Sequence, residues 1–362
     1  MQKINFGYAL FIFIMVVVFL SACAPVSATV SAERGNGVPS PAGELGNIQP
    51  QAEPTTGVYL PAILKPPPSG ERGRVQIVNN NVVADNGFPL RGEHVVFNTD
   101  TDSNAWTMAA MYDVNVWRML RDDYRLNTIR LMMSRPPQNW GGGPGDNCEP
   151  PIYRCYPLDY VHPNGKTTLQ VMDDMVNMAA ALGMYIIIDY HPVLGHYEVS
   201  VDAAGWWSQV APRYADRTHV IYEASNEPGG SSLTRYEEEL YALIRSYAPD
   251  THIILWSFDT LNSGRKGQVD KADSIDYSNA SVGYHPYWSY NTADLETLRS
   301  AYPVINTEIG ADRVKRTGQE EANNVSWIWL DGAAGLYPGT PPADTFQPED
   351  VTWPADPDAV DR

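Results

Sequence analysis

Apolar residues recur along the chain in short runs, separated by segments of helical periodicity. Each run is near-continuously apolar and rich in β-branched and aromatic residues, as is typical of strands buried on both faces. Eight such runs span residues 90–97, 127–133, 184–191, 219–228, 252–258, 280–288, 303–310 and 325–332. The clearest helical segments are 167–183, which opens on Thr167 and closes on Gly183, and 232–248, with Ser232 as its expected N-cap.

This alternation predicts an α/β fold with a parallel sheet covered by helices. Eight repeats over residues 75–345 suit a closed (β/α)8 TIM barrel, which usually takes about 250 residues. An open doubly wound sheet is the alternative, but no Gly-rich dinucleotide loop follows the first strand. We also expect an N-terminal β-hairpin around Asn86-Gly87 and a short fifth helix within 264–279. The last helix should be short or missing, because the chain after Gly332 is rich in Pro and Asp.

The first residues have the pattern of a targeting segment. Lys3 precedes an apolar run that ends in Leu20-Ser21-Ala22-Cys23, which predicts a lipoprotein-type signal peptide over 1–23 with Cys23 lipidated. Ordinary secretory cleavage after Ala24 is the alternative. Both interpretations place the protein outside the cytoplasm, as a bacterial membrane-anchored lipoprotein or as a secreted protein.

The other segments outside the repeats differ in composition. We expect a Pro/Ser/Gly-rich linker over 24–70, the barrel domain over 71–345 and an acidic tail over 346–362. In an exported protein, Cys148 and Cys155, which share one Pro/Gly-rich loop, are expected to form a disulfide. A metal site at these cysteines is disfavoured, because no histidine or further cysteine has ligand spacing there.

Charge narrows the range of partners. The chain of 362 residues has a formal net charge of −18, which argues against a nucleic-acid partner. Its 10 Trp and 21 Tyr suit the binding of sugar rings, although aromatic residues also fill cores. Apart from the lipid anchor, we expect no membrane contact, and we expect a monomer.

Two glutamates stand where predicted strands end. Glu227 follows the fourth run, in "VIYEASNEPGG", and Glu308 closes the seventh, in "VINTEIGA". In a (β/α)8 barrel the carboxyl ends of all strands meet at one face, so the two side chains are expected to converge over the barrel axis. Two carboxylates flanking one bond are what glycoside hydrolysis requires. The sequence therefore predicts a glycosidase site.

The motifs at the strand ends resemble those of the cellulase-type retaining glycoside hydrolases of family five, over roughly residues 75–335. The residues that match the family's functional positions are Arg130 in "NTIRLMM", His191 in "IIDYHP", Asn226 and Glu227 in "SNEP", His285 and Tyr287 in "GYHPYW", Glu308, and Trp329 or, as an alternative, Trp327. "GFPLRGEH" is similar to the family's entry strand, but Glu93-His94 replaces the usual Val-Asn.

The resemblance implies a role for each matching residue. Glu227 would be the general acid/base and Glu308 the nucleophile. The remaining residues would orient these two or bind sugar, namely Arg130, His191, Asn226, His285, Tyr287 and Trp329. Some have structural alternatives, since histidines and Tyr287 are also found in cores, and Trp206, Trp207 and Trp288 are either outer sugar platforms or packing residues. Asp189 is interpreted as structural, below His191.

The function that follows is endo-acting cleavage of a β-linked polysaccharide or oligosaccharide by double displacement, with β-1,4-glucan as the favoured substrate. A β-mannanase or an exo-β-glucanase of the same family is the alternative, and a transglycosylase would use the same residues. A non-catalytic glycan-binding surface lipoprotein is the alternative from another class. No metal and no organic cofactor is expected, because the two carboxylates supply acid, base and nucleophile.

Overall fold

The computed structural model describes residues 70–96, 113–133, 158–159, 161, 165–191, 201–286, 291–309 and 313–330. The expected signal peptide with Cys23, the linker up to residue 69, the pair Cys148 and Cys155 and the acidic tail lie outside these ranges, and these expectations stay predictions. Within the described ranges, no helix combines the length and the apolar composition needed to cross a bilayer.

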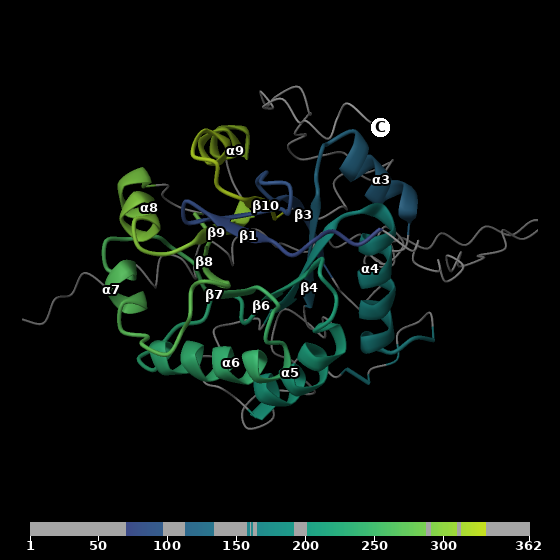
Figure 1. Ribbon diagram of the computed structural model, residues 1–362, viewed down its shortest axis with the longest axis horizontal. Helices are drawn as coiled ribbons and strands as arrows, with labels where there is room; N and C mark the ends of the chain where they lie inside the picture. Colours follow the sequence, from purple (N-terminus) through teal and green to yellow (C-terminus); the bar gives the residue numbers. More distant parts are fainter. Residues whose placement is uncertain are drawn as a thin grey trace, which may run out of the picture. The chain divides into compact units, whose positions relative to one another are not determined.

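Eight parallel strands form a closed ring at the centre of the barrel domain (Figure 1). They are β3 (Arg91–Val96), β4 (Thr128–Met133), β5 (Tyr185–Tyr190), β6 (Val220–Glu223), β7 (Ile253–Phe258), β8 (Ala280–Tyr284), β9 (Val304–Ile309) and β10 (Trp327–Trp329). Each strand pairs in parallel with the next one along the chain, and β10 pairs with β3. The predicted (β/α)8 barrel is confirmed.

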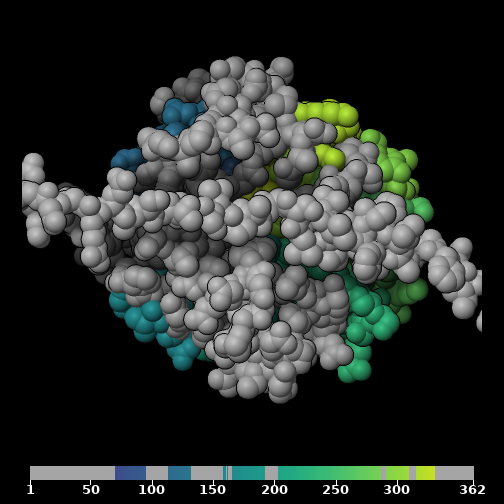
Figure 2. Space-filling view, turned by 180° about the vertical axis from the view of Figure 1, so that it is seen from behind, coloured from purple at the N-terminus to yellow at the C-terminus, as the bar shows by residue number. Residues whose placement is uncertain are grey.

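One helix follows each strand from β3 to β9 and packs on the outside of the ring (Figure 1). These helices are α3 (Val114–Asp122), α4 (Thr168–Leu182), α5 (Val201–Tyr214), α6 (Leu233–Tyr247), α7 (Arg265–Val269), α8 (Thr292–Arg299) and α9 (Arg313–Ala322). Seen from behind, the coloured segments follow the same order around the rim, from blue through teal and green to lime (Figure 2). The expected shortness or absence of a last helix concerns residues after 330, which are outside the described ranges.

The helix ends test the expected capping chemistry. In α4, the Thr167 hydroxyl accepts from the Gln170 N–H in a capping box, and Gly183 closes the helix at φ 65°. Helix α7 has only 5 residues, as expected for the fifth repeat. Ser232 is the N-cap of α6, as expected, but its side chain makes no capping hydrogen bond. Its φ of −99° and ψ of 11° differ from the extended backbone of typical N-caps.

An antiparallel hairpin precedes the barrel, but its turn differs from the expected one. Strands β1 (Gln76–Val78) and β2 (Asn81–Val83) are joined by Asn79 and Asn80, both with positive φ. Asparagine tolerates this left-handed conformation, which a tight two-residue hairpin needs. Asn86-Gly87 instead forms a second turn after β2, closed by one bridge.

The inward side of the barrel changes from apolar to polar along the strands. The apolar end is filled by residues from both the hairpin and the barrel, namely Val75, Val82, Ala84, Leu90, Tyr185, Ile187, Ile221, Ile254, Ile305 and Ile328. Successive side chains on one face of a strand are two residues apart. Two positions beyond Ile187, Ile221 and Ile305 stand the buried polar residues Asp189, Glu223 and Thr307. The carboxyl end of the barrel therefore contains a buried polar cluster above an apolar plug.

Candidate active site

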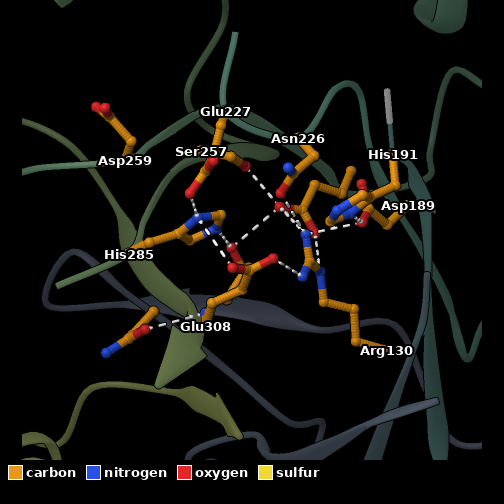
Figure 3. Close-up of polar contacts among 12 residues, drawn as sticks. Arg130, Asp189, His191, Asn226, Glu227, Ser257, Asp259, His285 and Glu308 are labelled. Carbon is orange, nitrogen blue, oxygen red and sulfur yellow. Dashed lines mark hydrogen bonds and ion pairs between the residues drawn. The ribbon is translucent and has the colours of Figure 1, made fainter. Parts of the chain in front are cut away.

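Glu227 and Glu308 meet at the carboxyl end of the barrel (Figure 3). Glu308 lies within β9, whereas Glu227 lies four residues beyond the end of β6, with φ at 41°. The expected fourth strand extended to residue 228, so the structure shortens it. One carboxylate oxygen of each glutamate and one ring nitrogen of His285 lie within 4.8 Å of one another. Two acids from different repeats therefore face each other at short range.

Arg130, from β4, is the cation at the centre of the site. Its buried guanidinium donates through Nε to Glu223 Oε2 at 2.6 Å and through Nη1 to Glu308 Oε1 at 2.6 Å. Its Nη2 lies 2.8 Å from Asp189 Oδ2 and 3.2 Å from Asn226 Oδ1. Burial opposes the charge of Arg130, but Asp189, Glu223 and Glu308 outweigh it, and the pKa of Arg130 is raised above its ordinary value. The three carboxylates thus explain how a guanidinium is held inside the barrel.

Glu227 is the more exposed of the two candidate acids. Its side chain is 34% exposed, compared with 3% for that of Glu308. Partial burial raises the pKa of Glu227, while His191 and Arg130 oppose that shift. A carboxyl group with a raised pKa can keep its proton closer to neutral pH, which is what a general acid needs.

His285 contacts both acids. Its Nδ1 lies 2.8 Å from Glu227 Oε1 and 3.4 Å from Glu308 Oε2, and its Nε2 lies 2.9 Å from Thr307 Oγ1. Burial lowers the pKa of His285 to about 4, although Glu308 and Glu223 favour the charged ring. The imidazole is therefore neutral near neutral pH.

His191 and Asn226 complete the expected cluster. His191 Nδ1 lies 2.6 Å from Asp189 Oδ2, and burial lowers the pKa of His191 to about 4. Burial also raises the pKa of Asp189 to about 7, although Arg130 opposes this shift. The backbone N–H of Asn226 donates to Tyr190 O at 2.9 Å, which ties the turn after β6 to β5. Asp189 lies under His191, as the sequence suggested.

Trp329 and Trp327, the tryptophans expected under the sugar, do not line this cluster. Trp329 is buried on the outer side of β10, where its Nε1 donates to Thr317 Oγ1 of α9 at 3.0 Å. Trp327 occupies the same face of the strand, since its Nε1 donates to Glu321 at 2.8 Å, and Ile328 between them enters the inner plug. The expectation that Trp329, or Trp327, forms the floor of the sugar site is therefore wrong: pleating directs both away from the barrel interior.

The other aromatic candidates divide into two groups. Trp206 and Trp207 are buried in the outer core, and Trp207 Nε1 donates to Ala224 O at 3.0 Å. Trp206 and Trp207 are therefore packing residues and not outer sugar platforms. Tyr287 and Trp288 lie outside the described residues, so the role expected for Tyr287 stays a prediction.

Four buried polar residues of the site were not among the expected site residues. Glu223 Oε1 accepts from Ser257 Oγ at 2.6 Å and from Thr307 Oγ1 at 3.0 Å. The ring of His94 is buried, and its centroid lies 6.3 Å from that of His191. A signal for Glu223 was present: it shares the inward face of its strand with Ile221, and a buried Arg130 requires acidic partners. No comparable signal marks Ser257 or Thr307, because hydroxyl residues are common in strands.

Ser257 reaches Glu223 from a strained bulge in β7. Trp256 and Ser257 both have positive φ, 72° and 25°, and the register between β7 and β8 shifts at this point. The buried Glu237 of α6 accepts from the Trp256 N–H at 3.0 Å. Such strain costs about 1–3 kcal/mol for each residue and persists only where surrounding contacts hold it. Here the bulge turns the Ser257 hydroxyl into the polar cluster.

Alanine at Gly283 is expected to destabilise the protein, because β8 makes room for this bulge at that position. A Cβ there would lie 2.6 Å from Ser257 Oγ, 2.9 Å from Ile254 Cγ2 and 3.1 Å from Ser257 Cα. We expect a loss of about 1–3 kcal/mol in the free energy of unfolding, measured by urea denaturation. Gly205→Ala is the control, since no atom lies within 4 Å of a Cβ there. Equal stability of the two variants would contradict the packing argument.

By distance alone, three groups of the site could also hold a metal ion. Among the described residues, Glu227, His285 and Glu308 each present one ligand atom within 4.8 Å of the others. The sequence-based expectation of no metal is not tested by this geometry.

Comparison with known proteins identifies related chains. The family model described as Cellulase (glycosyl hydrolase family 5) matches residues 86–334. Endoglucanase E-5 of Thermobifida fusca is 32% identical over 164 residues, which cover 41% of this chain and 35% of that protein. The chain spans less than half the length of this and similar endoglucanases.

Solved structures with the same barrel include two relevant enzymes. The catalytic domain of Thermobifida fusca endoglucanase Cel5A (E5) matches with a TM-score of 0.51 and 22% identity, over 71% of this chain and 84% of that one. The β-mannanase from Thermomonospora fusca matches with a TM-score of 0.53 and 14% identity, over 71% and 83%. At these identities the likeness concerns the fold.

Proposed function

The chain belongs to glycosyl hydrolase family 5, and from that premise we propose that it is a retaining endo-acting hydrolase of β-linked polysaccharide. In the proposed double displacement, Glu227 protonates the glycosidic oxygen while the carboxylate of Glu308 attacks the anomeric carbon. Water then cleaves the glycosyl ester with Glu227 as the base. The chemistry needs no cofactor.

The separation of the two acids is the observation that carries this proposal. Retaining glycosidases place their carboxyl groups about 5 Å apart, whereas inverting enzymes leave about 6.5–9.5 Å for a water molecule. Oxygens of Glu227 and Glu308 lie within 4.8 Å of each other, which supports the retaining geometry. The environments also divide the roles: Glu227 is half-buried with a raised pKa, and Glu308 is buried and ion-paired with Arg130.

The neighbouring residues have roles that follow from their contacts. Arg130 would keep Glu308 oriented and charged through the 2.6 Å bond from Nη1. Asn226 would bind the 2-hydroxyl of the sugar at the cleavage point, and His191 would bind a neighbouring hydroxyl. Tyr287 is proposed as a second donor to Glu308 on the sequence motif alone.

We favour β-1,4-glucan as the substrate, because relatives of this chain are named endoglucanases. A β-mannan is the second candidate, since a β-mannanase shares the barrel. A non-catalytic glycan-binding protein would have no need to hold two acids this close, with one of them on a buried arginine.

Product analysis tests the proposal. We expect the protein to release oligosaccharides from the interior of a soluble β-1,4-glucan, with slower or no release from β-mannan and mixed-linkage glucan. Proton NMR of the first products should show the β-anomer before mutarotation. Initial formation of the α-anomer would overturn the retaining assignment, and release of mannose oligosaccharides alone would reassign the substrate.

The alkaline limb of the pH–activity profile, where activity falls as pH rises, should be set by the loss of the proton from Glu227. An acid must be protonated to act, so activity falls as pH rises through its pKa. Because burial raises the pKa of Glu227 above the ordinary 4.5, the fall in kcat/KM should lie above the usual carboxyl range. Glu227→Gln should abolish this limb in kcat/KM profiles measured, for both proteins, with an aryl glycoside whose leaving group needs the proton. A limb at the ordinary carboxyl pKa would contradict the proposed environment of Glu227.

Export is proposed from the sequence pattern before residue 24. The lipoprotein form would attach through Cys23, and the secreted form would be free. Fractionation of a bacterial host expressing the full chain distinguishes them: wild-type protein is expected in the membrane fraction and Cys23→Ala in the soluble fraction. Soluble wild-type protein would favour secretory cleavage.

A further inference from the structure

Both ring nitrogens of His285 are engaged, and the two partners differ in kind. Nε2 faces Thr307 Oγ1 at 2.9 Å, and Nδ1 faces Glu227 Oε1 at 2.8 Å. A neutral imidazole has one donor and one acceptor nitrogen, and the surrounding bonds decide which is which. The inference below rests on the proposed role of Glu227.

The direction of the bonds can be followed from Glu223. This carboxylate is the ion-pair partner of Arg130 at 2.6 Å, and a carboxylate in an ion pair only accepts hydrogen bonds. Thr307 Oγ1 lies 3.0 Å from Glu223 Oε1, so the hydroxyl donates to it. A hydroxyl has one proton, and toward His285 Thr307 can therefore only accept.

The proton on the imidazole is thereby placed on Nε2. With Nε2–H donating to Thr307, a neutral His285 offers a lone pair at Nδ1. Burial lowers the pKa of His285 to about 4, which keeps the ring neutral under ordinary conditions. The short contact from Nδ1 to Glu227 Oε1 then requires Glu227 to be the donor. Only the protonated carboxyl group, the acid form, can make that bond.

We propose that Thr307 and Glu223 are positioning residues that fix the Nε2–H tautomer of His285 and so keep the catalytic proton on Glu227. The four residues form a chain of hydrogen bonds, here called the relay. In it Glu227 donates to His285, His285 donates to Thr307 and Thr307 donates to Glu223. It also serves the second half of the reaction. Once Glu227 has given its proton to the leaving oxygen, it faces a lone pair instead of a donor, which favours taking a proton back from the attacking water.

The charged and titratable groups around the relay come from four strands of the barrel. They are His94 from β3, Arg130 from β4, Asp189 and His191 from β5, and Glu308 from β9. Glu308 Oε2 lies 3.4 Å from Nδ1, farther than Glu227, and its other oxygen accepts from Arg130. The competing arrangement is a doubly protonated His285 between two carboxylates, and the test separates it from the proposed tautomer.

The tautomer is directly measurable without catalysis. In the full-length protein labelled with ¹⁵N-histidine, NMR at neutral pH should show His285 with a protonated Nε2 and an unprotonated Nδ1. The His285 signals are assigned by their loss in His285→Gln. Protonated nitrogens at both positions, or a proton on Nδ1 alone, would overturn the proposal whether or not the protein hydrolyses glycans.

Matched variants test the contribution of Thr307. Thr307→Val removes the hydroxyl at nearly constant shape and should shift His285 toward the Nδ1–H tautomer. Nδ1–H then stabilises ionised Glu227, so the alkaline limb of kcat/KM should move about one pH unit lower, the effect of one hydrogen bond to a charged group. Thr307→Ser should restore the wild-type limb. Thr317→Val, which removes a buried hydroxyl from the Trp329 contact on α9, should leave the limb in place.

Leaving-group dependence gives the second kinetic measure. In Thr307→Val, a glycoside with a poor leaving group should slow at least about tenfold more than one with a nitrophenolate leaving group, because only the former needs the proton. An unchanged limb together with equal losses for the two substrates would refute the role of Thr307. Absence of hydrolysis by wild-type protein, with the expected tautomer seen by NMR, would refute the proposed function and leave the relay standing.

Discussion

Alanine at Glu308 is expected to lower kcat/KM on a β-1,4-glucan by at least about a thousandfold, the scale seen when a catalytic nucleophile is removed. Asp189 and Glu223, the two other acids on Arg130, have fully buried side chains, so neither is placed to attack a bound sugar in its stead. Glu227→Ala should lose a similar factor on the same substrate. Initial rates of reducing-sugar release give the comparison.

Leaving-group ability should then distinguish the two variants. An aryl β-cellobioside with a dinitrophenolate leaving group needs no proton, so it should restore much of the first-step rate in Glu227→Ala and none of it in Glu308→Ala. Glu239→Ala, at an exposed position of α6, is the control and should keep wild-type rates. Wild-type activity in Glu308→Ala would refute the mechanism, and equal rescue of both variants would refute the assignment of roles.

Methionine at Arg130 is expected to cost about 3–5 kcal/mol in the free energy of unfolding at neutral pH, the effect of leaving buried charges uncompensated. Three carboxylates lie within 2.8 Å of this guanidinium, from Asp189, Glu223 and Glu308. Without it they must be protonated or remain unpaired in the barrel. Urea denaturation of purified protein measures the loss.

The loss should depend on pH in a definite direction. In the native protein the pKa of Asp189 is raised by burial to about 7. A carboxyl group with a raised folded-state pKa disfavours folding as pH rises from its unfolded value toward its folded value. Arg130 opposes this rise in the pKa of Asp189, and removing Arg130 makes ionisation of Asp189 costlier still, so the deficit of Arg130→Met should be smaller at acidic pH than at neutral pH.

Arg91→Met provides the matched control for Arg130. Arg91 also lies in a barrel strand, but its ion pair with Glu321, at 2.7 Å from Nε, retains some contact with solvent, the two side chains being 3% and 7% exposed. We expect a smaller loss from it. A deficit in Arg130→Met that is no larger than that of Arg91→Met, or that grows toward acidic pH, would contradict the view of Arg130 as the charge-balancing centre.

Much of the architecture was predictable because it depends on local composition. Each of the eight apolar runs contains one of the strands β3 to β10, and α4 begins and ends at its expected caps. The hairpin turn was misplaced because two candidate turns follow each other closely, and Asn79-Asn80 is the one that joins the paired strands. Nothing local distinguishes the two turns, since both contain residues that tolerate positive φ.

The sequence predicted those site residues whose burial would cost free energy without the partners that a site provides. A buried Arg130 requires acids, and Glu227 and Glu308 at strand ends imply a meeting point. Thr307 and Ser257 were missed because a hydroxyl acquires a role only from what lies opposite it. Ser257 depends further on the β7 bulge, whose backbone is held by Glu237 from a helix and by the missing side chain at Gly283.

By itself, the sequence determined the number and order of the repeats and the two acids placed at strand ends, since hydrophobic periodicity and turn residues act over short stretches of chain. Only the tertiary structure decided which side chains share the interior. Trp327 and Trp329 turn outward, and Glu223 and Thr307 turn inward beside His285. The physical reason is that the register of each strand and the bulges in its neighbours decide whether a side chain points into or out of the barrel. A shift of one residue moves the side chain to the opposite face.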